Sequence, residues 1–392
     1  MSRRAALIIL DGVGIGGASD QARYGDAGSD TLGNVLRWAA ERGAGPWPHL
    51  ERLGLGCCAQ LAGMPPARTP LAAYGTAQPQ SPGKDSTTGH WELCGLILPE
   101  PFPTFPGGFP AELVAEFARR TGRGVLGNKA ASGTAILDEL GPAHRASGSW
   151  IVYTSADSVF QIAAHEGTVP LQELYRGCEV ARTLCVGPWG VSRVIARPFE
   201  GGPGDWRRTA GRKDYSLAPV GPTLLDHLEE AGIPRVGIGK VDDLFAGRGI
   251  QSEHTATNAR AYQLIRQAMG EVTEGFIFAN VIEFDQTWGH RNDVAGFVAG
   301  LDELDQAIDG LIGAAQPDDL VIFTADHGND PTTPSTDHSR ERVPVLVVGP
   351  KVRSVSIGER STLADVGQTI AAFLGARPLA AGTSFLGEVW GG

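Results

Sequence analysis

The sequence contains no apolar run long enough to cross a bilayer, few cysteines and no excess of basic residues. A membrane-spanning helix needs roughly 20 consecutive apolar residues, so we expect no membrane partner. The five cysteines are odd in number and lack the spacing of metal-binding knuckles, which is typical of reduced thiols in a cytoplasmic protein. With a net charge of −11 and no evident basic face, we expect no nucleic-acid partner.

Internal repeats and low-complexity tracts are also absent, and 42% of the residues are hydrophobic, which is ample for a large core. Strand-like and helix-like segments alternate through both ends of the chain, which indicates an α/β fold with a mostly parallel sheet between helices. The middle begins rich in Pro, Gly and aromatic residues and then has helices and strands of its own. We therefore predict a core domain of residues 1–96 and 217–392, with residues 97–216 inserted as an α+β cap domain.

Carboxylate and imidazole side chains follow two apolar, strand-like runs near the C-terminus. Asp326 and His327 come after residues 320–323, with His338 eleven residues beyond His327. Asp285 follows the run of residues 276–284, with His290 five residues later. Such nitrogen and oxygen ligands suit a borderline divalent ion such as Zn²⁺ or Mn²⁺. Five ligands are too many for one tetrahedral ion, which indicates two ions.

A sixth possible ligand, Asp11, follows the apolar strand predicted over residues 5–10. In open α/β sheets, binding sites form beyond the carboxyl ends of the strands, where Asp11, Asp285 and Asp326 would all lie. A solvated loop acid or a helix cap is the ordinary explanation for one such residue. Three of them, two spaced with histidine, favour a shared metal site.

The glycines after Asp11 raise a different function, because Gly12, Gly14 and Gly17 formally match the dinucleotide-binding fingerprint. That fingerprint requires a helix to begin at its third glycine, so that the pyrophosphate meets a helix N-terminus. Residues 18–26 lack helical periodicity, and the next helix is predicted to start near residue 30. We therefore do not expect a nicotinamide or flavin site.

Three consecutive hydroxyl residues, Ser86, Thr87 and Thr88, follow a Lys-Asp pair and precede a predicted helix. Taken alone, this run is typical of a helix N-cap. Beside a two-metal site it has a second possible use, because a metal lowers the pKa of a bound alcohol and makes it a nucleophile. A helix N-terminus also favours a phosphate group. The run alone leaves all three hydroxyls as candidates.

With these segments together, the sequence resembles the bacterial-type phosphopentomutases of the alkaline phosphatase superfamily. The resemblance runs essentially from end to end. It is carried by residues 10–16, 26–31, 83–85, 89–92, 127–134, 153–158, 195–199, 284–291 and 324–331. The short Asp-His-Gly motif alone would indicate only the superfamily, whereas the whole set is specific for the family.

The resemblance implies an alkaline-phosphatase-like core that holds two Mn²⁺ ions. The implied ligands are Asp285, His290 and His338 for one ion, and Asp11, Asp326 and His327 for the other. The phosphorylatable hydroxyl would join the second set. The family usually has Thr directly after its Lys-Asp pair, where this chain has Ser86. The resemblance therefore implies Ser86 as the nucleophile, with Thr87 and Thr88 still open.

The implied reaction interconverts ribose 1-phosphate and ribose 5-phosphate, and the corresponding 2-deoxy pair. It would proceed through a phosphoenzyme and a pentose 1,5-bisphosphate, with a sugar 1,6-bisphosphate as activator. A metal-dependent phosphatase or another sugar phosphomutase on the same scaffold is the alternative. A non-catalytic binding protein is a third reading, but it would need neither six metal ligands nor a nucleophile.

Five arginines lie within twenty residues of the predicted cap of this acidic protein. Guanidinium groups bind phosphate bidentately, and we expect Arg193 and Arg208 to hold the distal phosphate. Lys240, at the end of a core strand, could complete that pocket. Ser155 and Asp157 end a cap strand and could face the sugar hydroxyls. Surface charges and strand-end turns explain such residues equally well.

Overall fold

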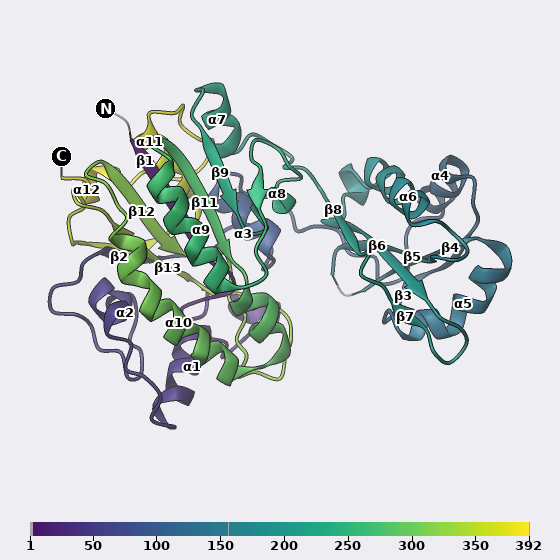
Figure 1. Ribbon diagram of the computed structural model, residues 1–392, viewed down its shortest axis with the longest axis horizontal. Helices are drawn as coiled ribbons and strands as arrows, with labels where there is room; N and C mark the ends of the chain where they lie inside the picture. The colour runs from purple at the N-terminus through teal and green to yellow at the C-terminus, as the bar shows by residue number, and fades with distance from the viewer. Residues whose placement is uncertain (1–2, 156, 392) are drawn as a thin grey trace. The chain divides into compact units, whose positions relative to one another are not determined.

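The computed structural model describes residues 3–155 and 157–391. The chain divides into two compact units, one of residues 1–101 and 219–392 and the other of residues 102–218 (Figure 1). We call them the core unit and the inserted unit. The inserted unit starts at residue 102, where we expected residue 97, and ends at residue 218, where we expected residue 216.

An eight-stranded sheet, in the order β10-β9-β11-β1-β12-β13-β2-β14, forms the centre of the core unit. Its strands are β1 (Arg4–Leu10), β2 (Ala73–Ala77), β9 (Arg235–Ile238), β10 (Ser252–Glu253), β11 (Gly275–Val281), β12 (Asp319–Thr324), β13 (Val343–Val348) and β14 (Ser356–Arg360). Only β13 runs antiparallel to its neighbours, so the sheet is mostly parallel, as predicted. Strands β11, β1 and β12 are buried along their whole length, and most of their side chains are apolar on both faces.

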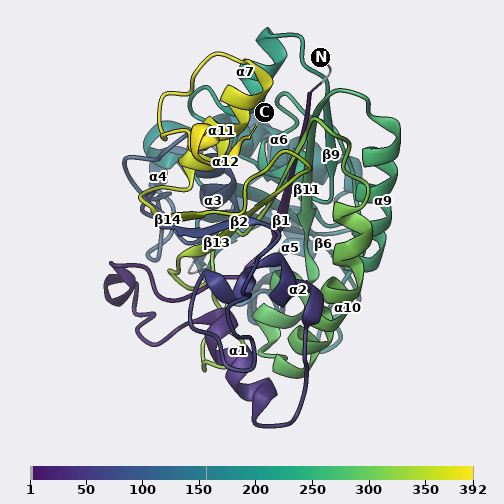
Figure 2. The same ribbon diagram turned by 90° about the vertical axis from the view of Figure 1, so that its left-hand side faces the viewer.

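Helices cover both faces of this sheet (Figure 2). They are α1 (Thr31–Ala40), α2 (Pro48–Leu53), α3 (Ser86–Leu93), α7 (Leu224–Glu230), α8 (Val241–Leu244), α9 (Asn258–Glu271), α10 (Val294–Ile312), α11 (Ala364–Leu374) and α12 (Leu386–Val389). Helix α10 packs against α1, α2 and α9, whereas α11 packs against α3 and α7. The nucleophile candidates therefore lie in the layer opposite α10.

Helix α10 is longer than the sequence indicates, because periodicity alone predicts a helix over residues 302–314. Asp293 caps the helix by accepting a hydrogen bond from the Gly296 amide, so the helix begins more than two turns earlier. Gly300 allows the ring of Trp288 to lie directly against the helix backbone. Glycine lowers helix propensity, and here this close packing offsets its cost.

The inserted unit has its own six-stranded mixed sheet and its own core. Strands β3 (Val125–Ala130), β4 (Trp150–Thr154), β5 (Val159–His165), β6 (Arg193–Glu200) and β7 (Arg207–Arg208) follow in that order, and β8 (Lys213–Ser216) also pairs with β6. Its helices are α4 (Ala111–Thr121), α5 (Ala135–Ser147) and α6 (Leu171–Leu184). Phe117, Trp150 and Phe160 are at the centre of the larger of its two hydrophobic clusters. This mixture of elements is the α+β arrangement predicted for the segment.

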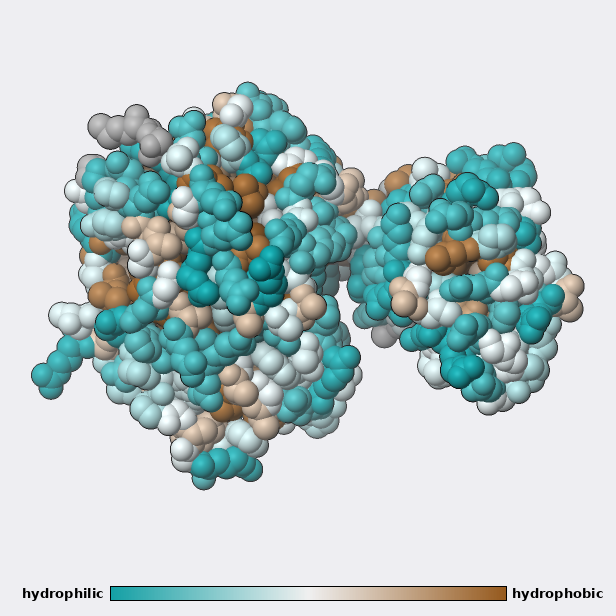
Figure 3. All heavy atoms as spheres, viewed as in Figure 1, coloured by the Kyte–Doolittle hydropathy of each residue, from teal (hydrophilic) through white to brown (hydrophobic). Residues whose placement is uncertain are grey.

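The surface is largely hydrophilic on the face shown in Figure 3, with scattered small apolar areas. Within the described ranges, the large hydrophobic side chains that are exposed are Leu71, Val186 and Val220. In the same ranges, no helix combines the length and apolar character that crossing a membrane requires. All five cysteines are free thiols.

Candidate active site

Three aspartates follow the three central strands of the core sheet. Strand β1 pairs in parallel with both β11 and β12, so the carboxyl ends of all three strands lie at the same sheet edge. Asp11 comes directly after β1 and Asp326 comes two residues after β12, and both are buried. Asp285, also buried, comes four residues after β11. The edge predicted from the strand pattern is therefore where these carboxylates meet.

The segment around Asp285 differs from the prediction of a strand that continues to residue 284. Strand β11 ends at Val281, and Phe284–Trp288 form a turn of π-helix, η4. A 3₁₀ turn, η5 (Gly289–Arg291), follows and carries His290. The apolar residue Phe284 packs against Trp288 and Phe297, so its hydrophobicity serves the turn and not the strand. Single π-helical turns are rare and frequently occur at functional sites.

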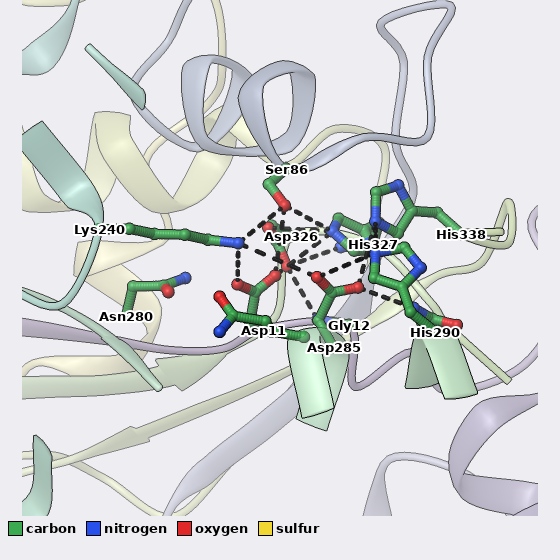
Figure 4. Close-up of polar contacts among 12 residues, drawn as sticks. Asp11, Gly12, Ser86, Lys240, Asn280, Asp285, His290, Asp326, His327 and His338 are labelled. Atoms are coloured by element: carbon green, nitrogen blue, oxygen red, sulfur yellow. Dashed lines mark hydrogen bonds and ion pairs between the residues drawn. The ribbon is translucent and has the colours of Figure 1, made fainter. Parts of the chain in front are cut away.

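One group of side chains gathers around Asp285 (Figure 4). The Nε2 atom of His338 lies 3.1 Å from Asp285 Oδ1, and that of His290 lies 3.5 Å from Asp285 Oδ2. The two imidazole Nε2 atoms are 3.1 Å apart. These three side chains are the set that the resemblance implies for one ion.

A second group lies beside the first and includes Asp11, Asp326 and His327. The Nε2 atom of His327 is 3.4 Å from Asp11 Oδ1 and 3.3 Å from Asp326 Oδ2. Ligand atoms of Asp285, His327 and His338 also lie within 4.8 Å of one another, so His327 is positioned between the two groups. The structure thus brings all six predicted ligands together.

The electrostatics of this cluster suit cations. Burial alone would raise the pKa of Asp11, but Lys240 and His327 hold it below its usual value. Burial would lower the pKa of His327, but Asp326 and Asp11 raise it to about 10. The buried carboxylates of the cluster therefore stabilise positive charge on Lys240 and on His327. Asp326 Oδ2 is buried without a well-aligned hydrogen-bond donor, so it has lone pairs available for an ion. The donor set, three carboxylates and three imidazoles, fits two divalent ions.

Ser86 is the first residue of helix α3, and its hydroxyl faces the cluster (Figure 4). Its Oγ atom lies 3.1 Å from His327 Nε2, 3.4 Å from Asp11 Oδ1 and 3.4 Å from Lys240 Nζ. The Thr88 hydroxyl instead donates to Asp85 Oδ2 at 2.6 Å, within the N-cap of the helix. Both interpretations of the hydroxyl run therefore apply, to different residues: Thr88 takes part in the cap, and Ser86 faces the cluster.

Lys240 supplies a fixed positive charge to the cluster. Its Nζ atom lies 2.7 Å from Asp11 Oδ2 and 3.9 Å from Asp285 Oδ2. Burial would lower its pKa, but these two carboxylates raise it above the usual value, so the ammonium stays charged. The sequence suggested Lys240 as a phosphate ligand and gave no sign that it pairs with a carboxylate.

We expect Lys240→Met to destabilise the metal-free protein by about 3 kcal/mol, because Asp11 would lose its partner in a buried site. Urea unfolding in EDTA and in saturating Mn²⁺ measures this, and Mn²⁺ should remove most of the difference by compensating Asp11. Lys351→Met is the control: Lys351 pairs with Asp318 at 2.7 Å on the surface. Its loss should cost less than about 1 kcal/mol in both conditions. Equal destabilisation by Lys240→Met with and without metal would contradict this account.

The remaining predicted substrate residues lie in the inserted unit. Ser155 and Asp157 follow the end of β4. Arg193, the first residue of β6, pairs with the first residue of β5, which runs antiparallel to β4. These three residues therefore lie at the same sheet edge. Arg208 is on β7 and pairs with Phe199, six residues further along β6, or about 20 Å away along the strand. Its guanidinium, however, lies against Gly133 in the loop after β3. The sheet register thus groups the first three residues. The Arg208 side chain reaches the same edge, because the end of β3 pairs with Thr154 at the end of β4.

Two buried residues at the cluster were not singled out as site residues. Asn329, in the loop after β12, donates through Nδ2 to Asp285 Oδ1 at 2.8 Å. His90, one turn after Ser86 on α3, has its Nδ1 atom 3.1 Å from Asp326 Oδ2. Each lies near a predicted functional residue in the sequence, and the four-residue spacing from Ser86 to His90 places both on one helix face. This spacing is the sequence pattern from which His90 could have been predicted as a site residue.

Comparison with known proteins relates the whole chain to a family of enzymes. Residues 3–378 match the model of the metalloenzyme superfamily. A phosphopentomutase from Dictyoglomus turgidum is 50% identical over 389 residues, which cover 99% of this chain and 98% of that protein. A phosphopentomutase from Anaeromyxobacter sp. (strain K) is 51% identical over 391 residues, which cover 99% of this chain and 100% of that protein.

Among solved structures, Leishmania mexicana phosphoglycerate mutase at low cobalt concentration aligns with a TM-score of 0.50 and 12% identity. The alignment covers 100% of this chain and 98% of that one. At this identity the likeness concerns the fold alone. With the superfamily match, it confirms the predicted fold class, an α/β core of the alkaline-phosphatase type.

Proposed function

The chain belongs to the phosphopentomutase family of the metalloenzyme superfamily, and from this membership we propose that it interconverts ribose 1-phosphate and ribose 5-phosphate, and their 2-deoxy counterparts. Phosphopentomutases are isomerases that move a phosphoryl group within one sugar. The observation that carries the proposal for this chain is the position of Ser86 Oγ, within 3.4 Å of Asp11, His327 and Lys240. A hydroxyl in that position can accept and return a phosphoryl group.

The six clustered ligands would hold two Mn²⁺ ions, one with Asp285, His290 and His338 and the other with Asp11, Asp326 and His327. This mixed set of imidazoles and carboxylates supports Mn²⁺ or a similar borderline ion. When bound, the ions would lower the pKa of the Ser86 hydroxyl and stabilise the charge on the attacking and leaving oxygens.

The chain's own groups would then orient the transfer. Lys240 Nζ, 3.4 Å from Ser86 Oγ, would face a phosphoryl oxygen and offset its charge. The first amides of α3 would donate to the same phosphate, because the N-terminus of a helix attracts anions. Both groups are held in place by the fold before substrate arrives, so they need little reorganisation during the reaction.

Two transfers complete the reaction. In the first, the bond between phosphorus and Ser86 Oγ breaks as the free sugar hydroxyl bonds to phosphorus and loses its proton, giving a pentose 1,5-bisphosphate. In the second, the other phosphoryl group returns to Ser86 Oγ and the released sugar oxygen takes up a proton. Protons and phosphoryl groups balance over the cycle. An unphosphorylated enzyme would first need a sugar 1,6-bisphosphate to phosphorylate Ser86.

The inserted unit would serve as the cap that keeps water from the phosphoenzyme. Arg193 and Arg208 would bind the distal phosphate, and Ser155 and Asp157 would contact the sugar hydroxyls. Arg193 lies 3.4 Å from Asp214, so a phosphate would compete with this carboxylate for the guanidinium. The five free cysteines support the further proposal that the enzyme works in the reducing cytoplasm.

Product analysis tests the proposed function against a metal-dependent phosphatase, which would use the same ligands. Enzyme with Mn²⁺, primed with a sugar 1,6-bisphosphate, should convert ribose 1-phosphate to ribose 5-phosphate with little free phosphate, as followed by ³¹P NMR. Stoichiometric release of inorganic phosphate without 5-phosphate would establish the phosphatase instead.

Replacing Arg193 or Arg208 by Ala should raise KM for ribose 5-phosphate. Each lost charge-assisted hydrogen bond to phosphate costs roughly 1.5–3 kcal/mol, or about 10- to 150-fold in affinity. Arg207→Ala is the matched control, because Arg207 adjoins Arg208 but lies 3.5 Å from Asp205 on the surface. Steady-state kinetics measure KM for each variant. An equal increase in KM for all three substitutions would rule out a specific role of Arg193 and Arg208 in phosphate binding.

A further inference from the structure

His90 lies wholly inside the core unit, between the nucleophile helix and a metal-ligand loop. Its Nε2 atom is 3.2 Å from Asn280 Nδ2 on β11. The amide nitrogen donates to Nε2, and both neighbours of Nδ1 can only accept, so Nδ1 carries a proton. The Nδ1 atom lies 2.9 Å from the Ser86 carbonyl oxygen and 3.1 Å from Asp326 Oδ2.

Of these two acceptors, Asp326 Oδ2 has the greater need of the His90 proton. The Ser86 carbonyl is the normal helical acceptor for the backbone amide four residues later. Asp326 Oδ2 is an anionic oxygen that is buried without a well-aligned donor, and a hydrogen bond to it would be charge-assisted. Gly89 lets the helix come this close, since a Cβ atom there would collide with the Asp326 carbonyl oxygen. The imidazole therefore connects α3 to one carboxylate of the cluster.

Asn329 lies beside the carboxylate of Asp285, as His90 lies beside that of Asp326. Its side chain is buried, and Nδ2 donates to Asp285 Oδ1 at 2.8 Å. Its backbone amide donates to the Gly12 carbonyl oxygen at 2.9 Å, directly after Asp11. This one residue thus links the three segments that carry the aspartates of the cluster.

We propose that His90 and Asn329 are positioning residues, each of which orients one metal-ligating carboxylate and sets the affinity of one ion. His90 acts on Asp326, in the group with Asp11 and His327, and Asn329 acts on Asp285, in the group with His290 and His338. Outer hydrogen-bond partners of metal ligands typically contribute about 10- to 100-fold to metal affinity. The inference rests on the two-ion site of the proposed function.

The test is direct Mn²⁺ binding to the full-length, metal-free protein, with free Mn²⁺ measured by electron paramagnetic resonance. His90→Gln keeps an amide near the Nε2 position and removes the Nδ1 donor, so one ion should weaken by roughly 10- to 100-fold. His90→Asn places an amide N–H at the Nδ1 position and should restore affinity close to that of the unmodified protein. Asn329→Leu, of similar volume, should weaken the other ion by a similar factor.

A His290→Ala background identifies which ion each residue affects, because that substitution removes a ligand of the Asp285 group only. In this background, adding His90→Gln should weaken the remaining ion, whereas adding Asn329→Leu should not. Urea unfolding of the metal-free proteins checks that each variant folds. If His90→Gln does not fold, Asn329→Leu still decides: it should weaken the ion of the Asp285 group alone, and unchanged affinity there contradicts the proposal.

The outcomes separate this inference from the function on which it rests. If the unmodified protein binds no Mn²⁺, the two-ion function itself fails. If it binds two ions but both substitutions weaken both ions equally, or His90→Asn restores nothing, the residues have a general structural role and the inference is wrong.

Discussion

Replacing Ser86 by Ala should abolish the phosphoenzyme and lower turnover by roughly three or more orders of magnitude. The reason is geometric: Ser86 Oγ is the hydroxyl that lies 3.1 Å from His327 Nε2 and 3.4 Å from Lys240 Nζ. Without it, the phosphoryl group has no acceptor between the two sugar positions. Incubation with a labelled sugar 1,6-bisphosphate, followed by phosphopeptide mapping, measures the label on each residue of the run.

The neighbouring hydroxyls provide the controls for this experiment. Thr87→Ala and Thr88→Ala should both keep the label on Ser86, and Thr88→Ala should mainly weaken the helix cap that its hydroxyl makes with Asp85. Ser86→Thr keeps a hydroxyl at this position and should keep substantial activity. Label on Thr87 or Thr88 that persists in Ser86→Ala would show that a different hydroxyl is the acceptor.

His327→Ala should remove metal and nearly all activity, because His327 belongs to the group of Asp11 and also lies within 4.8 Å of ligand atoms of Asp285 and His338. His290→Ala should remove one ion with the fold intact, since the His290 side chain is 37% exposed. At an Mn²⁺ concentration of 100 times its Kd, each ion adds about 2.7 kcal/mol to the free energy of unfolding of the unmodified protein. Metal analysis and urea unfolding with and without Mn²⁺ follow the loss of that increment in the variants.

His254→Ala is the matched control for metal binding. His254 forms a third group of possible ligands with Asp242 and Asp243, but this group is largely solvent-exposed. Exposed side chains remain hydrated and gain little from an ion, so this substitution should leave both the Mn²⁺ content and the turnover unchanged. Full metal occupancy and normal turnover in His327→Ala and His290→Ala would refute the ligand assignment.

Much of the core sheet could be predicted because short runs of neighbouring residues indicate its strands and their ends. Strand β1 is one continuous apolar run, and Asp11 directly after it marks the end of the strand. The ends of β11 and α10 were predicted less well. Phe284 is as apolar as the strand before it, yet it packs in a π-helical turn, and glycines concealed the early start of α10. Hydrophobicity alone does not distinguish burial in a strand from burial in a turn.

The sequence by itself determined the residue types of the site, their places after strands and the membership in a family, because strand ends and motif spacings are encoded over a few residues. Only the tertiary structure decided which hydroxyl of the run faces the ligands, that Lys240 pairs with Asp11, and that His90 and Asn329 contact the carboxylates. Ser86 and His327 are 241 residues apart in the chain. Contacts over such separations depend on how helices and loops pack on the sheet, and no local pattern of residues records that packing.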